Sequence, residues 1–411
     1  MLPPMAPDIL ATLDPRLLGR RLQEARKARG LTQEDAAREI GAARTTLVAV
    51  EKGERRIRPD ELVRLARVYG RSVSEFLRTS EPVEAFAVQL RAALAPAALA
   101  DARTQGEVEG AALEFERLCE DYLALERLNG STLRRIYPVP YELSGIDPEQ
   151  AGEDVAIAER NRLSLGDGPL LNLRGILEND VGLRIFAIEL PSRIAGMFTY
   201  TDQLGGCIAL NRKHPPERRR MSLAHEFAHF LSKRFAPEVT TLGRVLRRSD
   251  LERFADTFAR AYLLPATGLR RRFTELRRSR RDGVTPANLC TLAHLYFVSV
   301  EALALRLEEL KLLRLGTWDR LKDAGFRVRE AQALLQLPER TEDELIVPIH
   351  YQYLAVRAYV RGELTEGQFA RFLRVDRLEA RRIADELGRR GVVTDEGDVG
   401  TLEMDLGDAV A

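Results

Sequence analysis

The residues with the clearest chemical potential form the motif HEFAH at 225–229. Residues four apart share one face of a helix, so His225 and His229 could hold one cation while Glu226 addresses the water beside it. No Pro or Gly interrupts residues 221–235, which favours a helix there. The alternative is a pair of core histidines with a glutamate facing solvent. The motif therefore predicts a hydrolytic metal centre with Glu226 as its acid–base group.

A third ligand is expected, because catalytic metal sites usually combine three protein ligands with one open position. The segment DLERFADTFARAYLL at 250–264 has the pattern of an amphipathic helix that ends at Pro265. One face of this helix carries small alanines, which leave room for the HEFAH helix, and the same face carries Glu252 and Asp256. We predict Glu252 as the third ligand. Asp256, one turn later, should accept a hydrogen bond from the far nitrogen of a ligand histidine. A solvated helical face is the alternative for both acids.

Other polar residues near the motif are harder to place. Arg218–Arg220 precede the HEFAH helix, where the helix dipole disfavours cations, so we expect this run at the surface. His214, His294 and Tyr200 are candidate donors to an oxyanion, although a lone histidine more often has a structural role. Cys119, Cys207 and Cys290 are widely separated, fit neither a disulfide framework nor a CxxC metal site, and are expected to be buried.

The length and composition indicate a multidomain globular chain. It has 411 residues, of which 45% are hydrophobic and 30% charged. We find no apolar run long enough for a membrane span and no secretory signal pattern, so we expect a cytoplasmic protein with no membrane partner. Residues 16–78 hold 16 Lys and Arg against nine Asp and Glu, whereas residues 341–411 hold nine against 15. The basic N-terminal segment favours a polyanionic partner, whereas the acidic C-terminal segment argues against nucleic acid binding there.

The hydrophobic patterns divide the chain into four regions. Short helices joined by glycine turns predict an all-α helix-turn-helix domain at 16–80. A helical connector of two or three helices follows at 81–150. In the region 151–315, alternating runs at 181–190, 195–200 and 205–211 predict a small antiparallel sheet among helices. Residues 316–411 read as a helical region for interaction or oligomerisation. The predicted fold class is mainly α with an α+β core.

The segments ERRRMSLAHEFAHFL, ERFADTFARAYLLP and FVSVEALALRL resemble the ImmA/IrrE family of metallopeptidases, within a similarity that extends over about residues 151–313. The resemblance implies a zincin-like (gluzincin) fold with one divalent ion, zinc or else manganese, on His225, His229 and Glu252. It also implies catalysis by Glu226 and cleavage of a protein, often a repressor. We further expect substrate to add as a strand along the edge formed by Gly205–Asn211.

The stretch GLTQEDAAREIGAARTTLVAVEKGER resembles the phage-repressor (XRE) helix-turn-helix family. That resemblance implies binding to double-stranded DNA, with Gln33 on a phosphate and with Arg44, Thr45 and Ala49 facing bases. Ala49 and its neighbour Val48 offer only apolar contact, where the family usually has polar side chains. The alternative is a helix-turn-helix kept for protein contact, and we expect a homodimer in either case.

Three functions remain open on the sequence. In the first, a DNA-targeted metalloendopeptidase of the zinc type cleaves a repressor or another regulatory protein in a stress or phage response. In the second, a transcriptional regulator uses the peptidase fold as a metal or ligand sensor without proteolysis. In the third, a phage-regulatory or antitoxin module acts through protein contact alone. The presence of Glu226 favours the first, because a pure sensor needs no general base.

Overall fold

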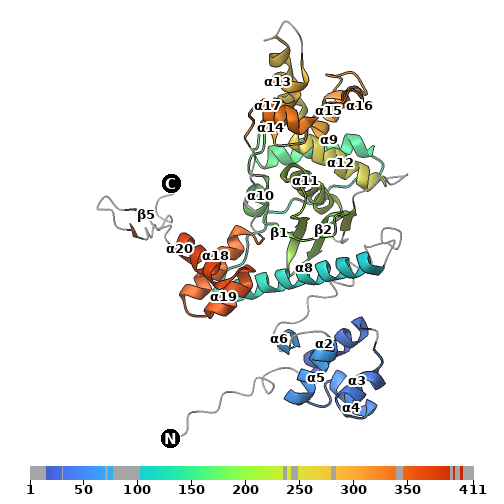
Figure 1. Cartoon of the computed structure of the whole chain (residues 1–411), viewed down its shortest axis with the longest axis vertical. Helices are drawn as coiled ribbons and strands as arrows, with labels where there is room; N and C mark the ends of the chain where they lie inside the picture. Colours follow the sequence, from blue (N-terminus) through green and yellow to red (C-terminus); the bar gives the residue numbers. More distant parts are fainter. Residues whose placement is uncertain are drawn as a thin grey trace. The chain divides into compact units, whose positions relative to one another are not determined.

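The computed structural model describes residues 15–29, 31–69, 73–76, 102–234, 238–241, 249–278, 284–338, 346–388, 392–393 and 399–400. The chain divides into two compact units, Met1–Glu84 and Ala85–Ala411 (Figure 1). Each unit has its own hydrophobic core. The expected fold class is confirmed: helix-turn-helix elements come first, a small sheet lies among helices, and helices follow.

The first unit is helical throughout its described residues. Thr32 begins its second helix with a capping box, in which its side chain and that of Asp35 satisfy each other's backbone amides. Gly41 and Gly53 adopt φ of +67° and +73°, the left-handed conformation that the predicted turns require. Its helices are α2 (Pro15–Ala28), α3 (Gln33–Glu39), α4 (Arg44–Glu51), α5 (Pro59–Tyr69) and α6 (Val73–Phe76).

The sheet of the second unit is mixed, so the predicted antiparallel sheet is wrong. Its strands are β1 (Arg184–Ile188), β2 (Ile194–Thr201), β3 (Gly205–Asn211) and β4 (Glu238–Thr241), in the order β1-β3-β2-β4. After the β2–β3 hairpin, β3 inserts between β2 and β1 and runs parallel to β1. Alternating residues identify strands, but they do not specify which neighbour each strand pairs with.

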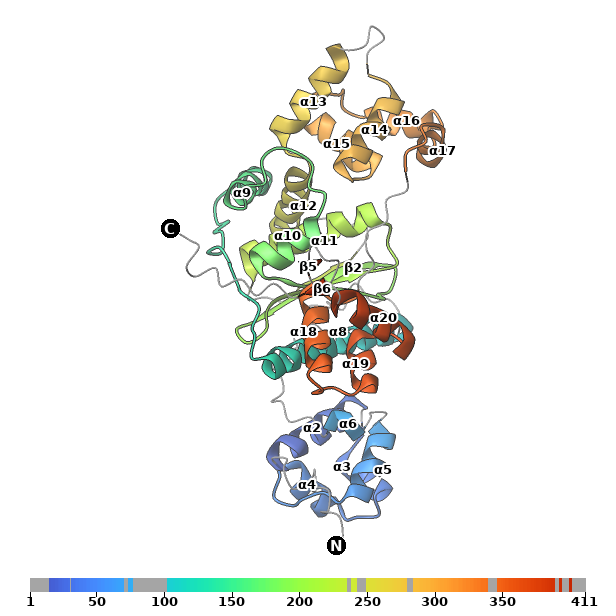
Figure 2. The ribbon, with the colours of Figure 1, turned by 90° about the vertical axis from the view of Figure 1, so that its left-hand side faces the viewer.

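Helices cover both faces of this sheet, as Figures 1 and 2 show. On one face lies α11 (Pro216–Lys233), with α12 (Asp250–Leu263) packed on it and α9 (Pro148–Arg162) on α12. On the other face lies α8 (Ala102–Asn129), where Phe115 meets Phe186 of β1 with ring centroids 5.9 Å apart. In the described part of the expected connector, α8 is one long helix.

The end of the chain joins the second unit in two places. Residues up to Leu337 pack on the core around the sheet and α11. The helices α18 (Ile349–Val360), α19 (Glu366–Leu373) and α20 (Arg377–Gly388) pack as a bundle beside α8. The remaining elements are α10 (Leu173–Ile176), the π-helix η1 (Leu177–Val181), α13 (Ala266–Arg278), α14 (Pro286–Tyr296), α15 (Val300–Glu309), α16 (Thr317–Asp323), α17 (Val328–Leu334), β5 (Val392–Val393) and β6 (Val399–Gly400).

Among the described residues no single helix is long and apolar enough to cross a membrane, although the bent pair α14–α15 passes on length and composition.

Candidate metal centre

The HEFAH motif lies on α11, which runs between the sheet and α12. Pro216 stands in its first turn, where a missing N–H costs no hydrogen bond. Phe227 faces α12, with its ring 5.8 Å from the rings of both Phe258 and Tyr262. This packing fixes the rotation of α11 and places its polar residues in the interior. His225, Glu226 and His229 are buried, at 6%, 0% and 1% exposure.

Three groups from the two helices converge on one point. The Nε2 atoms of His225 and His229 are 3.0 Å apart. One carboxylate oxygen of Glu252 lies 3.3 Å from Nε2 of His229, and the other lies 3.6 Å from Nε2 of His225. Among the described residues this is the group of His, Cys, Asp and Glu side chains that could hold a metal ion. The helices thus bring together the residues predicted as ligands.

The spacing of these atoms fits a small divalent cation. A tetrahedral ion with bonds of about 2.0–2.1 Å holds its ligand atoms about 3.3 Å apart. The three separations here scatter around that value, and the donors are two imidazoles and a carboxylate, which suit zinc. Without a cation, two facing imidazole nitrogens in a buried site could share at most one proton. The donor set therefore matches a catalytic site with three protein ligands.

Asp256 lies behind His225 and not behind His229. Its carboxylate is 3.1 Å from Nδ1 of His225, so it can accept the Nδ1–H and direct Nε2 toward Glu252. Burial opposes protonation of His225, yet the hydrogen bond that its Nδ1–H donates to Asp256 and the charges of Glu226 and Glu252 raise the pKa of this imidazole. The Nδ1 atom of His229 is buried without a hydrogen-bond partner in the described structure. The imidazole ring of His229 is therefore oriented by the side chains packed around it.

The carboxylate of Glu252 is held in its charged form. A hydrogen bond with His229 lowers the pKa of Glu252 most, burial opposes this, and electrostatic interactions with the two histidines add to the lowering. The side chain is 34% exposed, more than either histidine. The site is therefore closed on the side of α11 and more open on the side of α12, where solvent or a substrate could approach.

The general-base candidate Glu226 packs against β2. A Cβ atom added at Gly196 would lie 2.7 Å from Oε1 of Glu226, closer than real contacts allow. The glycine therefore lets the strand backbone approach the carboxylate directly. The sequence analysis did not single out this residue. A glycine inside a predicted strand was the available signal, because it often marks a close approach to the backbone.

The other candidates from the sequence lie outside this cluster. His214 is buried in the turn after β3, where its Nε2 is 3.0 Å from the carbonyl oxygen of Ser192. The Tyr200 hydroxyl donates to Asp202 at 3.3 Å. His294 lies half-buried on α14. Neither His214 nor His294 belongs to the metal-binding group found among the described residues.

Two sequence predictions about this region are wrong, one of them only in part. Arg218 is exposed as expected. Arg219 and Arg220 are buried instead, their guanidinium groups donate to backbone carbonyls, and that of Arg220 also stacks on the ring of Phe297 at 4.5 Å. Gly205–Asn211 is not an open edge, because β3 lies between β1 and β2 and is buried along its whole length. Both errors arise from tertiary contacts that local patterns do not encode.

The residues predicted to contact DNA lie on α3 and α4. Arg44 and Thr45 are exposed in the first turn of α4, and Ala49 is half-buried one turn later. Gln33 begins α3, and its amide donates to Glu51 at 2.9 Å. Glu51 also pairs with the buried Arg26 at 2.6 Å. This ion pair fixes the end of α4 against α2 and α3, and the sequence analysis missed it.

Two family models match the chain. An IrrE N-terminal-like domain of peptidase family M78 matches residues 178–308, which contain β1–β3, α11, α12 and α15 up to Glu308. A helix-turn-helix model matches residues 22–76. The molecule is therefore a helix-turn-helix domain fused to a peptidase-class domain. More specifically, the chain carries an IrrE N-terminal-like (M78) domain behind a helix-turn-helix domain of the XRE type.

Comparisons with curated proteins and with solved structures give no further information on the function. A search of the curated proteins finds no match. Among solved structures, the chain is similar to the "Crystal Structure of Bacillus thuringiensis PlcR in complex with the peptide PapR7 and DNA", at 10% identity over 90% of this chain and 94% of that chain. The TM-score is 0.17, so this likeness carries no argument about fold or function.

Proposed function

We propose that the chain is a metal-dependent endopeptidase that cleaves a repressor or another regulatory protein, and that its helix-turn-helix domain directs it to DNA. The observation that carries the proposal is the convergence of His225, His229 and Glu252 within one cluster, with Glu226 on the same helix turn. The match to peptidase family M78 supports it. A site built only to sense metal would need the three ligands but not the carboxylate of Glu226.

The mechanism follows from the placement of the side chains. His225, His229 and Glu252 would hold the ion, which when bound supplies a Lewis acid that acidifies water and polarises a carbonyl group. Glu226 takes the proton from the attacking water and returns it to the leaving amine. Its burial removes competing solvent, which strengthens its interactions with a reacting group. Asp256 keeps the proton of His225 on Nδ1, so that Nε2 stays free as a ligand.

The DNA-binding role rests on the first unit. The exposed first turn of α4 carries Arg44 and Thr45, which are placed to reach base edges when that helix enters the major groove. Gln33 keeps one amide N–H beyond the one that it gives to Glu51, and this second N–H could reach a phosphate. Ala49 would contact a thymine methyl group.

The decisive experiment compares wild type with Glu226→Gln, both loaded with zinc or manganese, on repressors encoded near the gene. We expect wild type to cleave one of them, and the variant to retain metal but lose about 10²- to 10⁴-fold in rate. Glu217→Gln is the matched control, because Glu217 lies in the first turn of the same helix and outside the metal cluster. Cleavage by both Glu226 forms, or by neither, would favour the sensor function.

A further inference from the structure

The helix α13 (Ala266–Arg278) carries an excess of positive charge. Its 13 residues include five arginines and one glutamate, a net charge of +4, whereas the whole chain has 63 basic and 62 acidic residues. The many arginines of the chain are thus balanced by acids overall, but not on this helix. Both ribbon views place α13 at the end of the second unit that is remote from α8 (Figures 1 and 2).

Packing fixes which side of α13 faces solvent. Leu269 and Phe273 are buried in the core around the sheet and α11, at 0% and 2% exposure. A Cβ atom added at Gly268 would collide with the carbonyl oxygen of Asp167, so the helix backbone lies directly on the turn that contains this residue. One turn later, Arg271 pairs with the Asp167 carboxylate through two hydrogen bonds of 2.8 and 2.9 Å. These contacts hold α13 in one rotation about its axis.

The opposite side of α13 is a continuous basic surface, which we call the arginine face. Residues three, four and seven apart share one side of a helix. That spacing brings together five exposed residues, Thr267, Arg270, Thr274, Arg277 and Arg278. Among the described residues, no acidic side chain forms an ion pair with any of these three arginines, since the ion pair of α13 belongs to Arg271. The face therefore presents cations with hydroxyl groups between them.

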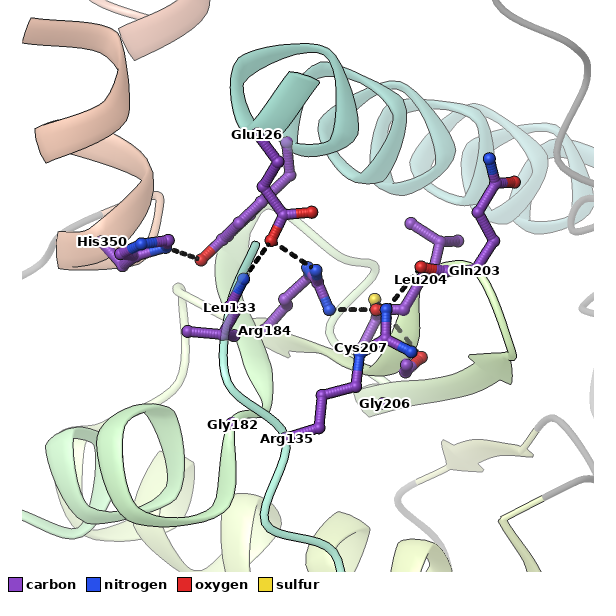
Figure 3. A network of polar contacts seen from close by, with 12 residues as sticks. Glu126, Leu133, Arg135, Gly182, Arg184, Gln203, Leu204, Gly206, Cys207 and His350 are labelled. Carbon is purple, nitrogen blue, oxygen red and sulfur yellow. Dashed lines mark hydrogen bonds and ion pairs between the residues drawn. The ribbon is translucent and has the colours of Figure 1, made fainter. Parts of the chain in front are cut away.

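Other arginines of the second unit stabilise its fold. Figure 3 shows one of them, the buried Arg184 of β1, which pairs with Glu126 of α8 at 2.7 Å. Arg306 is also buried and pairs with Glu153. The arginine face has no such acceptors among the described residues. The helix dipole accounts for its two arginines in the last turn, but not for Arg270 about two turns earlier.

The chemistry of the arginine face suits phosphate groups. Guanidinium groups bind phosphate oxygens bidentately, and arginine and threonine side chains both contact the DNA backbone in protein complexes. An anionic membrane fits less well, because the apolar side of this helix is buried in the core and cannot enter lipid. The helix-turn-helix match of the first unit makes a DNA duplex the polyanion that this chain would meet.

We propose that the arginine face contacts the phosphate backbone of double-stranded DNA and gives the second unit a sequence-independent share of DNA binding. This inference rests on the DNA-binding role proposed for the first unit. The helix-turn-helix reads the sequence, whereas α13 adds affinity on any duplex. Each phosphate that a cation neutralises releases counterions, so the contribution of α13 weakens steeply as salt rises. These contacts would also keep the peptidase unit near a repressor bound to the same DNA.

The test measures binding of the full-length protein to a fluorescent random-sequence duplex by anisotropy, from about 50 to about 200 mM salt. Arg270→Gln combined with Arg277→Gln should remove two phosphate contacts, which makes the slope of log K against log salt shallower by about 1.8. Over this range the variant should lose about tenfold less affinity than wild type. The control is Arg357→Gln with Arg371→Gln, which removes the same charge from exposed positions on α18 and α19.

A gain of charge on the same face distinguishes a lost contact from misfolding. Thr274→Arg adds a cation beside Arg270 and Arg278, so it should steepen the slope by about 0.9 and tighten binding to every duplex by the same factor. Slopes equal to that of wild type in both kinds of α13 variant would overturn the proposal. Unchanged DNA binding with loss of binding to poly-glutamate would assign the arginine face to an acidic protein instead.

Arg44→Ala separates this inference from the function proposed for the first unit. It should reduce the preference for an operator duplex over the random one, whereas the α13 substitutions should weaken binding to both duplexes equally. An effect of Arg44→Ala without any effect of the α13 substitutions would retain the helix-turn-helix role and reject the arginine face. If wild-type protein bound neither duplex, both proposals would be wrong.

Discussion

In the proposed metal site, Asp256 acts through His225. Its carboxylate lies 3.1 Å from Nδ1 of that histidine and would fix its tautomer, so Asp256→Asn should weaken metal affinity by about 10- to 100-fold without removing a ligand. Competition with a chromophoric chelator measures this change. Asp250→Asn on the same helix is the control, because the Asp250 side chain is 83% exposed and pairs with Arg253 at the surface. Equal affinity in the two variants would show that Asp256 does not position the imidazole.

Gly196 sets the space that Glu226 occupies. In Gly196→Ala the new methyl group would overlap Oε1 of Glu226, and the carbonyl of Ala209 prevents the strand from moving away freely. A displacement of about 1 Å can cost up to about 10²-fold in rate, so we expect cleavage to fall by more than tenfold while metal content stays at wild-type level. Gly168→Ala, where an added Cβ meets nothing within 4 Å, should retain activity. Loss of metal in Gly196→Ala would indicate a folding defect instead.

At the scale of elements, the position of α12 decides whether Glu252 reaches the histidines. Gly152 on α9 allows α12 to come close, since a Cβ there would lie 2.9 Å from the backbone nitrogen of Phe258. Gly152→Ala should therefore cost about 1–3 kcal/mol of unfolding free energy and weaken metal binding. Gly110→Ala on α8 meets no neighbour and should stabilise the protein by about 0.5–1 kcal/mol. Denaturant titration distinguishes the two, and equal effects would contradict close packing of α9 on α12.

The elements also show what the sequence could predict. The spacing in HEFAH and on the 250–264 helix predicts two helical faces, and these faces meet in the structure because apolar residues fix the rotation of each helix. Strand order could not be predicted, because β3 pairs with β1 across a crossover that no local pattern records. The burial of Arg220 was missed for the same reason. Its acceptors are backbone carbonyls that lie 49 to 77 residues away in sequence.

At the scale of the whole molecule, the two units have separate cores. The core of the first unit lies between Leu18 and Phe76, and the cluster around the sheet and α11 in the second unit begins at Ala151. Neither of these clusters includes residues of the other, so we expect the helices of the first unit to fold without support from the candidate metal site.

This independence predicts that metal and DNA bind without affecting each other. Stripping the metal with a chelator should leave affinity for a selected operator duplex unchanged, as measured by fluorescence anisotropy at fixed salt. Arg44→Ala should lower that affinity by roughly 5- to 150-fold, the equivalent of about 1–3 kcal/mol, with metal content unaltered. Lys52→Ala, an exposed residue just after α4, is the control for loss of positive charge alone. A change of about fivefold or more on chelation would instead reveal a coupling free energy between the units. In that event metal occupancy itself would regulate the DNA-bound state.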